Sequence, residues 1–160
     1  MARRRFDWSH LKGVRFRHRV PIGNPEVEEV FMPKAKQLTA WVQDRPGMLG
    51  EVASALGAKK VNVLALFAGV LDGRGAIRMV VDKPAAAKKI LAKHGWETTE
   101  EDLLQVTLSD KPGSLGTVAG KLGQAGINIQ YAYAGTAHSA AKVNVYFAVG
   151  DLQAALKAVR

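Results

Sequence analysis

The sequence predicts an α+β fold made of two consecutive β-α-β-β-α-β units, each with an antiparallel sheet that carries both of its helices on one face. The first observation is an internal repeat. Asp44–Gly50 recurs as Asp110–Gly116, and 12 of the 26 positions from 44 to 69 are identical to those 66 residues later. The second is that apolar residues switch between strand and helix periodicity in the order of this unit. A repeat constrains the architecture before single residues are interpreted.

The first copy is expected to span residues 36–101. Its first strand alternates apolar residues at Leu38, Ala40 and Val42, and proline in the following turn suits the start of a helix. The remaining expected elements are a helix after the turn at 44–47, strands at 61–70 and 76–81 joined by a hairpin turn at 72–75, a helix at 84–94 ended by Gly95, and a short strand at 96–99.

The second copy is expected to span residues 102–160. Its expected elements are a strand at 103–108, a helix at 112–125, strands at 127–133 and 142–149, and a final helix from 151. Gly126 follows the first helix where the first copy has Lys60, so that helix of the first copy should end differently or with strain. Both copies therefore read as ferredoxin-like units in tandem, and the second lacks its own fourth strand.

An unpaired sheet edge favours aggregation unless another segment covers it. Residues 1–35 form an extension outside the repeat, and it contains two short candidate strands at 14–20 and 27–32. We expect one of these to cover the open edge of the second copy.

The extension is also strongly basic, since residues 1–36 carry a net charge of +5 out of +9 for the chain. Aromatic residues Trp8 and Phe16 are interleaved with the arginines, a composition that suits docking on an acidic protein surface or, less favourably, on nucleic acid. The alternative is a solubilising tail. The candidate docking residues are Arg3, Arg4, Arg5, Arg15, Arg17 and Arg19.

Composition excludes several kinds of site. The chain has no cysteine, so disulfides, thiolate metal sites and cysteine nucleophiles are excluded. Its longest apolar run, 61–71, is too short to span a bilayer, and the basic N-terminus lacks the apolar segment of a secretory signal. The four histidines show no metal-ligand spacing, and nothing suggests a catalytic triad or a phosphate loop. We expect a cytoplasmic protein without catalytic residues, metal or cofactor.

The turn Asp-x-Pro-Gly after an alternating strand, a Leu-Gly helix, and then Val61-Asn62-Val63 or Ile127-Asn128-Ile129 resemble the ACT domain. The resemblance covers residues 36–160 and is greatest to small stand-alone tandem ACT proteins. It implies a ligand, commonly a free amino acid, bound where two ACT domains meet. It also implies a homodimer and an association with an enzyme of amino-acid metabolism. The ligand-contacting residues that it implies are Asp44, Gly47, Asn62, Asp110, Gly113 and Asn128.

The residues themselves offer a physical case for such a site. A helix N-terminus has unpaired backbone N–H groups that suit a carboxylate, and glycine allows close approach of the ligand. The aspartates or the asparagine amides would accept from an ammonium. Each position also has a structural interpretation. The aspartates would cap the helix, the glycines would serve only the turn, and the asparagines would relieve unusual dihedrals. Core packing is favoured for Tyr131 and Tyr133.

Two functions follow from this reading. The first is a non-catalytic sensor that binds a free amino acid between modules and shifts the population of the arrangement that contacts it. The alternative is an accessory assembly subunit that keeps the fold without a ligand and docks on a larger complex through the basic arm.

Overall fold

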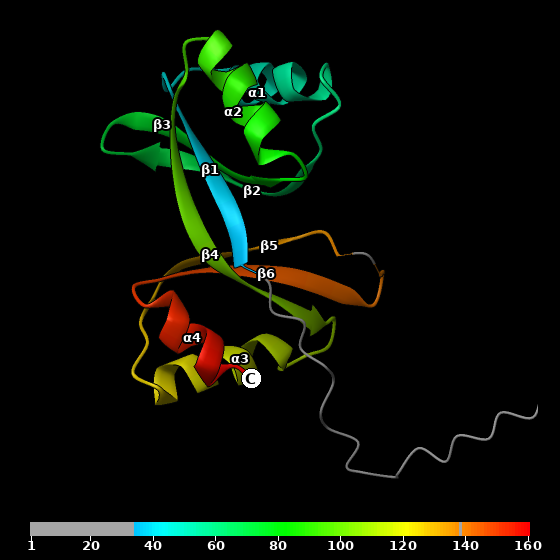
Figure 1. The fold of residues 1–160 in the computed structure, drawn as a ribbon, viewed down its shortest axis with the longest axis vertical. Coiled ribbons are helices and arrows are strands. Elements are labelled where there is room, and N and C mark those ends of the chain that lie inside the picture. Colours follow the sequence, from blue (N-terminus) through cyan, green and yellow to red (C-terminus); the bar gives the residue numbers. More distant parts are fainter. Residues whose placement is uncertain (1–33, 138) are drawn as a thin grey trace, which may run out of the picture.

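In the computed structural model, residues 34–137 and 139–160 are described. The elements are β1 (Lys34–Val42), α1 (Met48–Gly57), β2 (Val63–Leu71), β3 (Arg74–Val81), α2 (Pro84–Lys93), β4 (Glu97–Ser109), α3 (Ser114–Gln124), β5 (Ile129–Gly135), β6 (Lys142–Val149) and α4 (Leu152–Ala158). Apart from one merger of strands, this order follows the predicted elements. All strand pairs are antiparallel, and the strands close into one barrel in the order β1-β3-β2-β5-β6-β4 (Figure 1).

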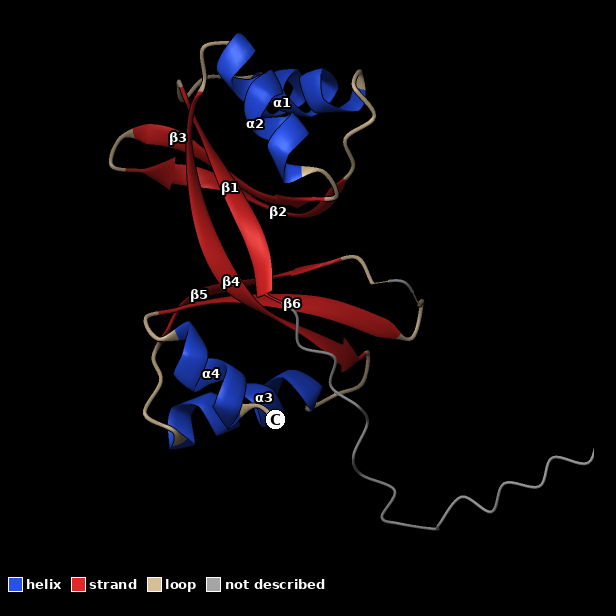
Figure 2. Cartoon of the chain, viewed as in Figure 1, coloured by secondary structure: helices blue, strands red, loops and turns tan. Residues whose placement is uncertain are grey.

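The helices form two outer layers, with the sheet between them (Figure 2). Helices α1 and α2 cover the outer face of β1–β3 and bury a core that includes Leu38, Leu56 and Met79. Helices α3 and α4 cover β5, β6 and the end of β4 over a second core around Leu122 and Phe147. A third cluster fills the inside of the barrel, so the two helix-backed halves pack through the sheet faces that lack helices.

The hairpin between β2 and β3 has the two-residue loop expected from its Asp-Gly sequence. Asp72 and Gly73 have φ angles of 51° and 74°. Positive φ at both central positions is the conformation that matches the right-handed twist of the flanking strands. The loop therefore sets the register in which Val70 lies opposite Gly75.

Strand β4 belongs to both halves of the molecule. Residues 97–104 pair with β1, residues 104–109 pair with β6, and Leu104 is bridged on both sides. The prediction of separate strands at 96–99 and 103–108 was therefore wrong, and the predicted boundary at 101/102 lies inside a strand. The charged residues between these two predicted strands have partners here. Lys36 Nζ lies 2.6 Å from Glu100 Oε1 and 3.3 Å from Asp102 Oδ1.

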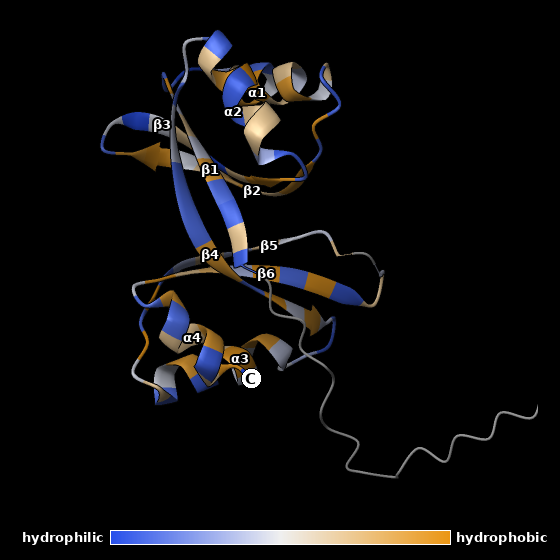
Figure 3. Ribbon diagram, viewed as in Figure 1, coloured by the Kyte–Doolittle hydropathy of each residue, from blue (hydrophilic) through white to orange (hydrophobic). Residues whose placement is uncertain are grey.

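The barrel has approximate twofold symmetry that matches the sequence repeat. Lys36 lies opposite Asp102, its counterpart 66 residues later. On the other side of the barrel, the ring of Phe67 stacks on that of its counterpart Tyr133, with centroids 6.5 Å apart. Figure 3 shows that the first part of β4 is hydrophilic where it crosses between the two halves.

From Gln105 to Leu108, the edge of β4 that pairs with β1 farther back has no strand partner among the described residues. Beyond Leu104 this strand pairs only with β6, and no strand follows α4. The predicted cover by residues 14–20 or 27–32 lies outside the described residues, as do the six arginines proposed for docking. No helix in the described ranges is long and apolar enough to cross a membrane.

Candidate functional site

The turns from β1 to α1 and from β4 to α3 place glycine at the helix N-cap. Gly47 and Gly113 have φ angles of 92° and 88°, and neither helix receives a hydrogen bond from a capping side chain. The capping interpretation of Asp44 and Asp110 is therefore wrong. Both residues are exposed. The first backbone N–H groups of α1 are left for other acceptors, whereas in α3 the Ser114 N–H donates to the Lys111 carbonyl at 3.3 Å.

The two turns differ in the charges beside them. In the first, Arg45 donates from Nη1 and Nη2 to the two carboxylate oxygens of Glu51, both at 2.9 Å, and this pair lowers the pKa of Glu51. In the second, the corresponding residues are Lys111 and Thr117, and the Thr117 hydroxyl donates to the Gly113 carbonyl at 3.2 Å. The repeat thus preserves the backbone of the turn but not its electrostatics.

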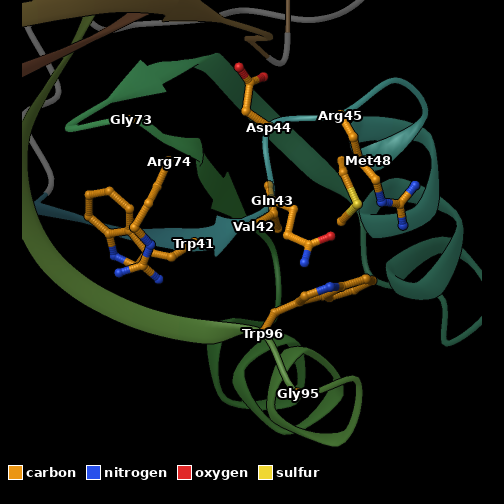
Figure 4. Close-up of a pocket in the computed structure, with 10 residues that line it drawn as sticks. All are labelled: Trp41, Val42, Gln43, Asp44, Arg45, Met48, Gly73, Arg74, Gly95 and Trp96. Atoms are coloured by element: carbon orange, nitrogen blue, oxygen red, sulfur yellow. The ribbon is translucent and has the colours of Figure 1, made fainter.

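A cavity of about 570 Å³ adjoins the first turn. Its wall combines the end of β1, the β2–β3 hairpin and the loop from α2 to β4. Figure 4 shows the Gln43 side chain next to the Trp96 indole, while the Asp44 carboxylate points away from both indoles. The residues that line the cavity are Trp41, Val42, Gln43, Asp44, Arg45, Met48, Gly73, Arg74, Gly95 and Trp96.

The aromatic side chains of this cavity are fixed by specific contacts. The Trp41 indole donates to the Thr99 hydroxyl at 3.1 Å, and the Arg74 guanidinium lies over its ring, 5.1 Å from the centroid. Arg74 also donates through Nη2 to Glu97 at 2.6 Å. Trp96 stacks on His94, with centroids 4.8 Å apart. The two indoles therefore form preorganised walls.

A second, smaller cavity of about 240 Å³ lies on the other side of the same turn, toward the end of β2. Asp44, Arg45 and Met48 line both cavities, and Leu49 and Val70 line the smaller one. These last two side chains are exposed, at 43% and 59%. The first turn thus lies between a polar aromatic cavity and an apolar patch.

Asn62 does not join this site. It follows the C-terminal end of α1, a helix of 10 residues and therefore about 15 Å long. Its backbone N–H donates to the Asp82 carboxylate at 2.8 Å, and its carbonyl accepts from the Asp82 N–H at 3.1 Å. Asn128 has the same position relative to α3, at the start of β5. Both asparagine side chains are exposed.

The two turns also do not face each other within one chain. Glu97 lies opposite Trp41, next to the first turn, whereas the second turn follows Ser109 at the other end of β4. Twelve residue steps along a strand amount to roughly 40 Å. The turns at 44–47 and 110–113, which were expected to form one site between the two modules, are therefore far apart in the isolated chain. The fold places the turns at opposite ends because β1 and β4 run antiparallel.

A polar cluster lies inside the barrel between the two halves. Gln37 is fully buried, and its amide group donates to Glu101 at 3.1 Å and to the Tyr131 hydroxyl at 2.7 Å, while its oxygen accepts from the Tyr133 hydroxyl at 2.7 Å. The Tyr131 hydroxyl donates to Glu101. The Arg78 guanidinium lies 4.5 Å from the centroid of the Tyr131 ring.

The same surroundings shift the phenol pKa values. Burial, followed by the hydrogen bond to Glu101, raises the pKa of Tyr131 to about 12. Burial also raises the pKa values of Tyr133 and Tyr146. Tyr131 and Tyr133 pack against the apolar cluster inside the barrel, as the packing interpretation predicted.

Sequence reasoning missed the aromatic lining of the large cavity. A signal was available, because the first and fourth strands are neighbours in a β-α-β-β-α-β sheet. That rule places Trp41, at the end of the first strand, near Trp96, at the start of the fourth. The described residues hold no group of three or more metal-ligating side chains.

Comparisons with known proteins agree with the resemblance seen in the sequence. The family model of the ACT domain matches residues 103–159. Protein BT0572 from Bacteroides thetaiotaomicron is structurally similar, with a TM-score of 0.71 and 26% identity over 78% of this chain and 85% of that chain. A search of the curated proteins found no match.

Two further structures share the fold. The regulatory subunit of aspartate kinase from Thermus thermophilus, in its ligand-free form, has a TM-score of 0.60 and 22% identity over 81% of this chain and 93% of that chain. The subunit from Thermus flavus has a TM-score of 0.55 and 22% identity over 81% and 94%. Residues 103–159 thus match the ACT domain family, and about four fifths of the chain shares the fold of these regulatory subunits.

Proposed function

We propose that this protein is a non-catalytic regulatory protein that binds a free amino acid at the first turn, residues 44–47. The observation that carries the proposal is the large cavity beside an uncapped helix N-terminus, where Asp44 and the α1 backbone meet. The ACT match and the fold shared with aspartate kinase regulatory subunits support a regulatory role. An enzyme of amino-acid metabolism in the cytoplasm is the partner class that this reading favours.

The geometry at the turn suits the two charged groups of an amino acid. Backbone N–H groups at a helix N-terminus attract a carboxylate. Gly47 has no side chain and so leaves space beside these groups. Any other residue there would also be strained at a φ of 92°. The exposed Asp44 carboxylate accepts from an ammonium. The Arg45–Glu51 pair is neutral overall, so it adds no net charge that would select against a zwitterion.

We further propose that a second copy of the chain completes the site. The turn at 110–113 is too far away to contribute, and an exposed apolar patch lies beside the first turn. Its members are Leu49 and Val70, which line the smaller cavity and are 43% and 59% exposed. Apolar patches of this kind mark association surfaces. A ligand held between two copies would favour the dimer in which both contact it.

A thermal-shift screen of the twenty amino acids tests the proposal. One or a few should raise the melting temperature, by mass action. Asp44→Ala should abolish the shift, because it removes the acceptor for the ammonium, whereas Asp110→Ala at the other turn is the matched control and should retain it. A flat screen on folded protein, or equal losses in both variants, would contradict the proposal. Sedimentation with and without ligand measures the dimer.

The basic extension favours a second candidate function, an accessory subunit that docks without a ligand. Nine of the first 36 residues are lysine or arginine. Under this proposal, replacing Arg15, Arg17 and Arg19 with glutamine weakens capture of an acidic partner protein, with a steep salt dependence. Nucleic acid is the less favoured partner. A filter-binding salt titration tests it, and no retention at low salt would exclude it.

A further inference from the structure

We propose that the large cavity selects an aromatic amino acid, with its ring between the two indoles and with Arg74 attracting its carboxylate in addition to the N–H groups at the start of α1. This inference rests on the proposed function and names the ligand class of the same site. It starts from the composition of the cavity, which pairs two tryptophans with a guanidinium and an amide on three separate segments of the chain.

The indoles provide the surface for a flat ring. His94 covers one face of the Trp96 ring, so the part of the ring that lines the cavity is not the part that contacts His94. The Gln43 side chain lies beside the Trp96 ring (Figure 4). Met48 lies on the same wall, and thioethers contact aromatic rings favourably. Aromatic pairs gain from offset or edge contacts beyond the area that they bury. A planar side chain therefore fits these walls better than a branched aliphatic one.

Arg74 supplies the charge preference. It stacks over Trp41 and uses Nη2 for Glu97, which leaves further guanidinium N–H groups for an anion. Arg74 already occupies the face of Trp41 that a ligand cation could bind, so a cationic ligand would be repelled there. The cavity thus disfavours lysine and arginine as ligands and favours a carboxylate beside a ring. The ammonium would be left to Gln43 or Asp44, which line the same cavity.

Among the described residues, this combination of two tryptophans and a guanidinium occurs once. The position 66 residues after Trp41 is Thr107, whose hydroxyl donates to Asn144 inside the sheet. The described part of the second half has no tryptophan. We therefore expect one ligand per chain, bound by the first half, although the repeat provides two similar turns.

Isothermal titration of the full chain tests the inference. L-phenylalanine or L-tryptophan should bind with one site per chain, and L-leucine and L-lysine at least about tenfold more weakly. 3-Phenylpropionate, which lacks the amine, should still bind. 2-Phenylethylamine, which lacks the carboxylate, should not. If phenylpropionate binds as tightly as phenylalanine, the ligand class is aromatic acids in general, and the amino-acid assignment is overturned.

The matched variants are Arg74→Gln and Trp96→Leu, with Lys111→Gln at the second turn as the control. We expect each of the first two to weaken phenylalanine binding about tenfold or more, and the control to bind as the parent does. The Arg74 side chain is half exposed, so Arg74→Gln should fold normally. It therefore still tests the inference if Trp96→Leu fails to fold. Tight binding of leucine or lysine would overturn this inference while leaving the proposed function intact. Binding of no amino acid by folded protein would overturn both.

Discussion

Single residues carry the small differences between the two copies, and the clearest is at the end of the first helix. In both copies the helix ends in the same type of backbone hydrogen bond. Val61 N donates to the Leu56 carbonyl in the first copy, and Ile127 N donates to the Leu122 carbonyl in the second. This arrangement needs a left-handed residue just before the donor. Gly126 adopts it with φ 72°, but the first copy uses Lys60 with φ 56°. The strain anticipated from the sequence at Lys60 is thus present.

Replacing Lys60 with glycine should therefore stabilise the protein. The Lys60 side chain is exposed, so little packing is lost, and relief of the left-handed conformation is worth about 1 kcal/mol. We expect a melting temperature a few degrees higher than that of the parent. The reverse change, Gly126→Ala, is the control and should lower it by a similar amount. An unchanged or lower melting temperature for Lys60→Gly would contradict this account.

The glycines of the two turns could be predicted from the sequence, whereas the positions of the two asparagines could not. The glycines at 47 and 113 were expected to shape the turns, and their positive φ angles agree. The role of the asparagines was harder to predict, because a helix of unknown length separates Asn62 from Asp44. Only the structure shows that they lie at opposite ends of α1.

At the scale of elements, the barrel depends on a narrow contact between β2 and β5. A single Cα pair, Ala65 with Gly135, defines the pairing, and the N–H of Thr136 donates to the Leu64 carbonyl at 2.9 Å. A Cβ at position 135 would lie 2.5 Å from both the Ala65 Cβ and the Leu64 oxygen. Glycine is required here because the two backbones approach too closely for any side chain.

Gly135→Ala should open this contact and lower the free energy of unfolding by about 1–3 kcal/mol, the usual cost of overpacking. The repeat offers a matched control, since Gly69 occupies the equivalent position in β2. A Cβ there would make only ordinary contacts of 3.8 and 3.9 Å with the Phe67 ring. Gly69→Ala should therefore change stability little. Urea unfolding of both variants measures the difference, and equal effects would refute the close-approach argument.

Most elements could be predicted from periodicity and turn residues. Strand β6, for example, has its predicted range, Lys142–Val149. Strand β4 did not, because the run Glu100-Glu101-Asp102 reads as a loop on its own. Its charges are satisfied by residues distant in sequence, namely Lys36, Lys88 and Gln37. No local pattern reveals such partners.

At the scale of the whole molecule, the polar cluster around the buried Gln37 joins the halves. Gln37 comes from β1, Glu101 from β4, and Tyr131 and Tyr133 from β5, so three strands meet at one fully paired amide. Buried polar groups with all partners present specify one arrangement, and removing one partner costs about 1–3 kcal/mol. The cluster therefore fixes how the two helix-backed halves sit against each other.

The tyrosines provide a direct readout of this arrangement, because all three in the chain have raised pKa values. The folded protein holds the phenolic protons more tightly than the unfolded chain, whose pKa is about 10. Tyrosine ionisation should thus leave stability unchanged below that pH and lower it as pH rises further.

Ultraviolet titration of the native protein should show phenolate appearing well above pH 10. In denaturant the transition should return to the ordinary value. Gln37→Ala should loosen the cluster and bring part of the native titration down toward that value. A native titration already centred at pH 10 would show that the phenols are freely solvated and would contradict the interior placement.

The shared strand has a consequence for how a signal could pass through this protein. Because β4 forms the last strand of one half and the first strand of the other, no flexible tether separates them. A change of twist at Glu97, beside the aromatic cavity, must be carried by the same backbone to Ser109. Communication between the two ends would then pass through the twist of β4. A chain cut between residues 101 and 102 would lose this communication and the continuity of the barrel.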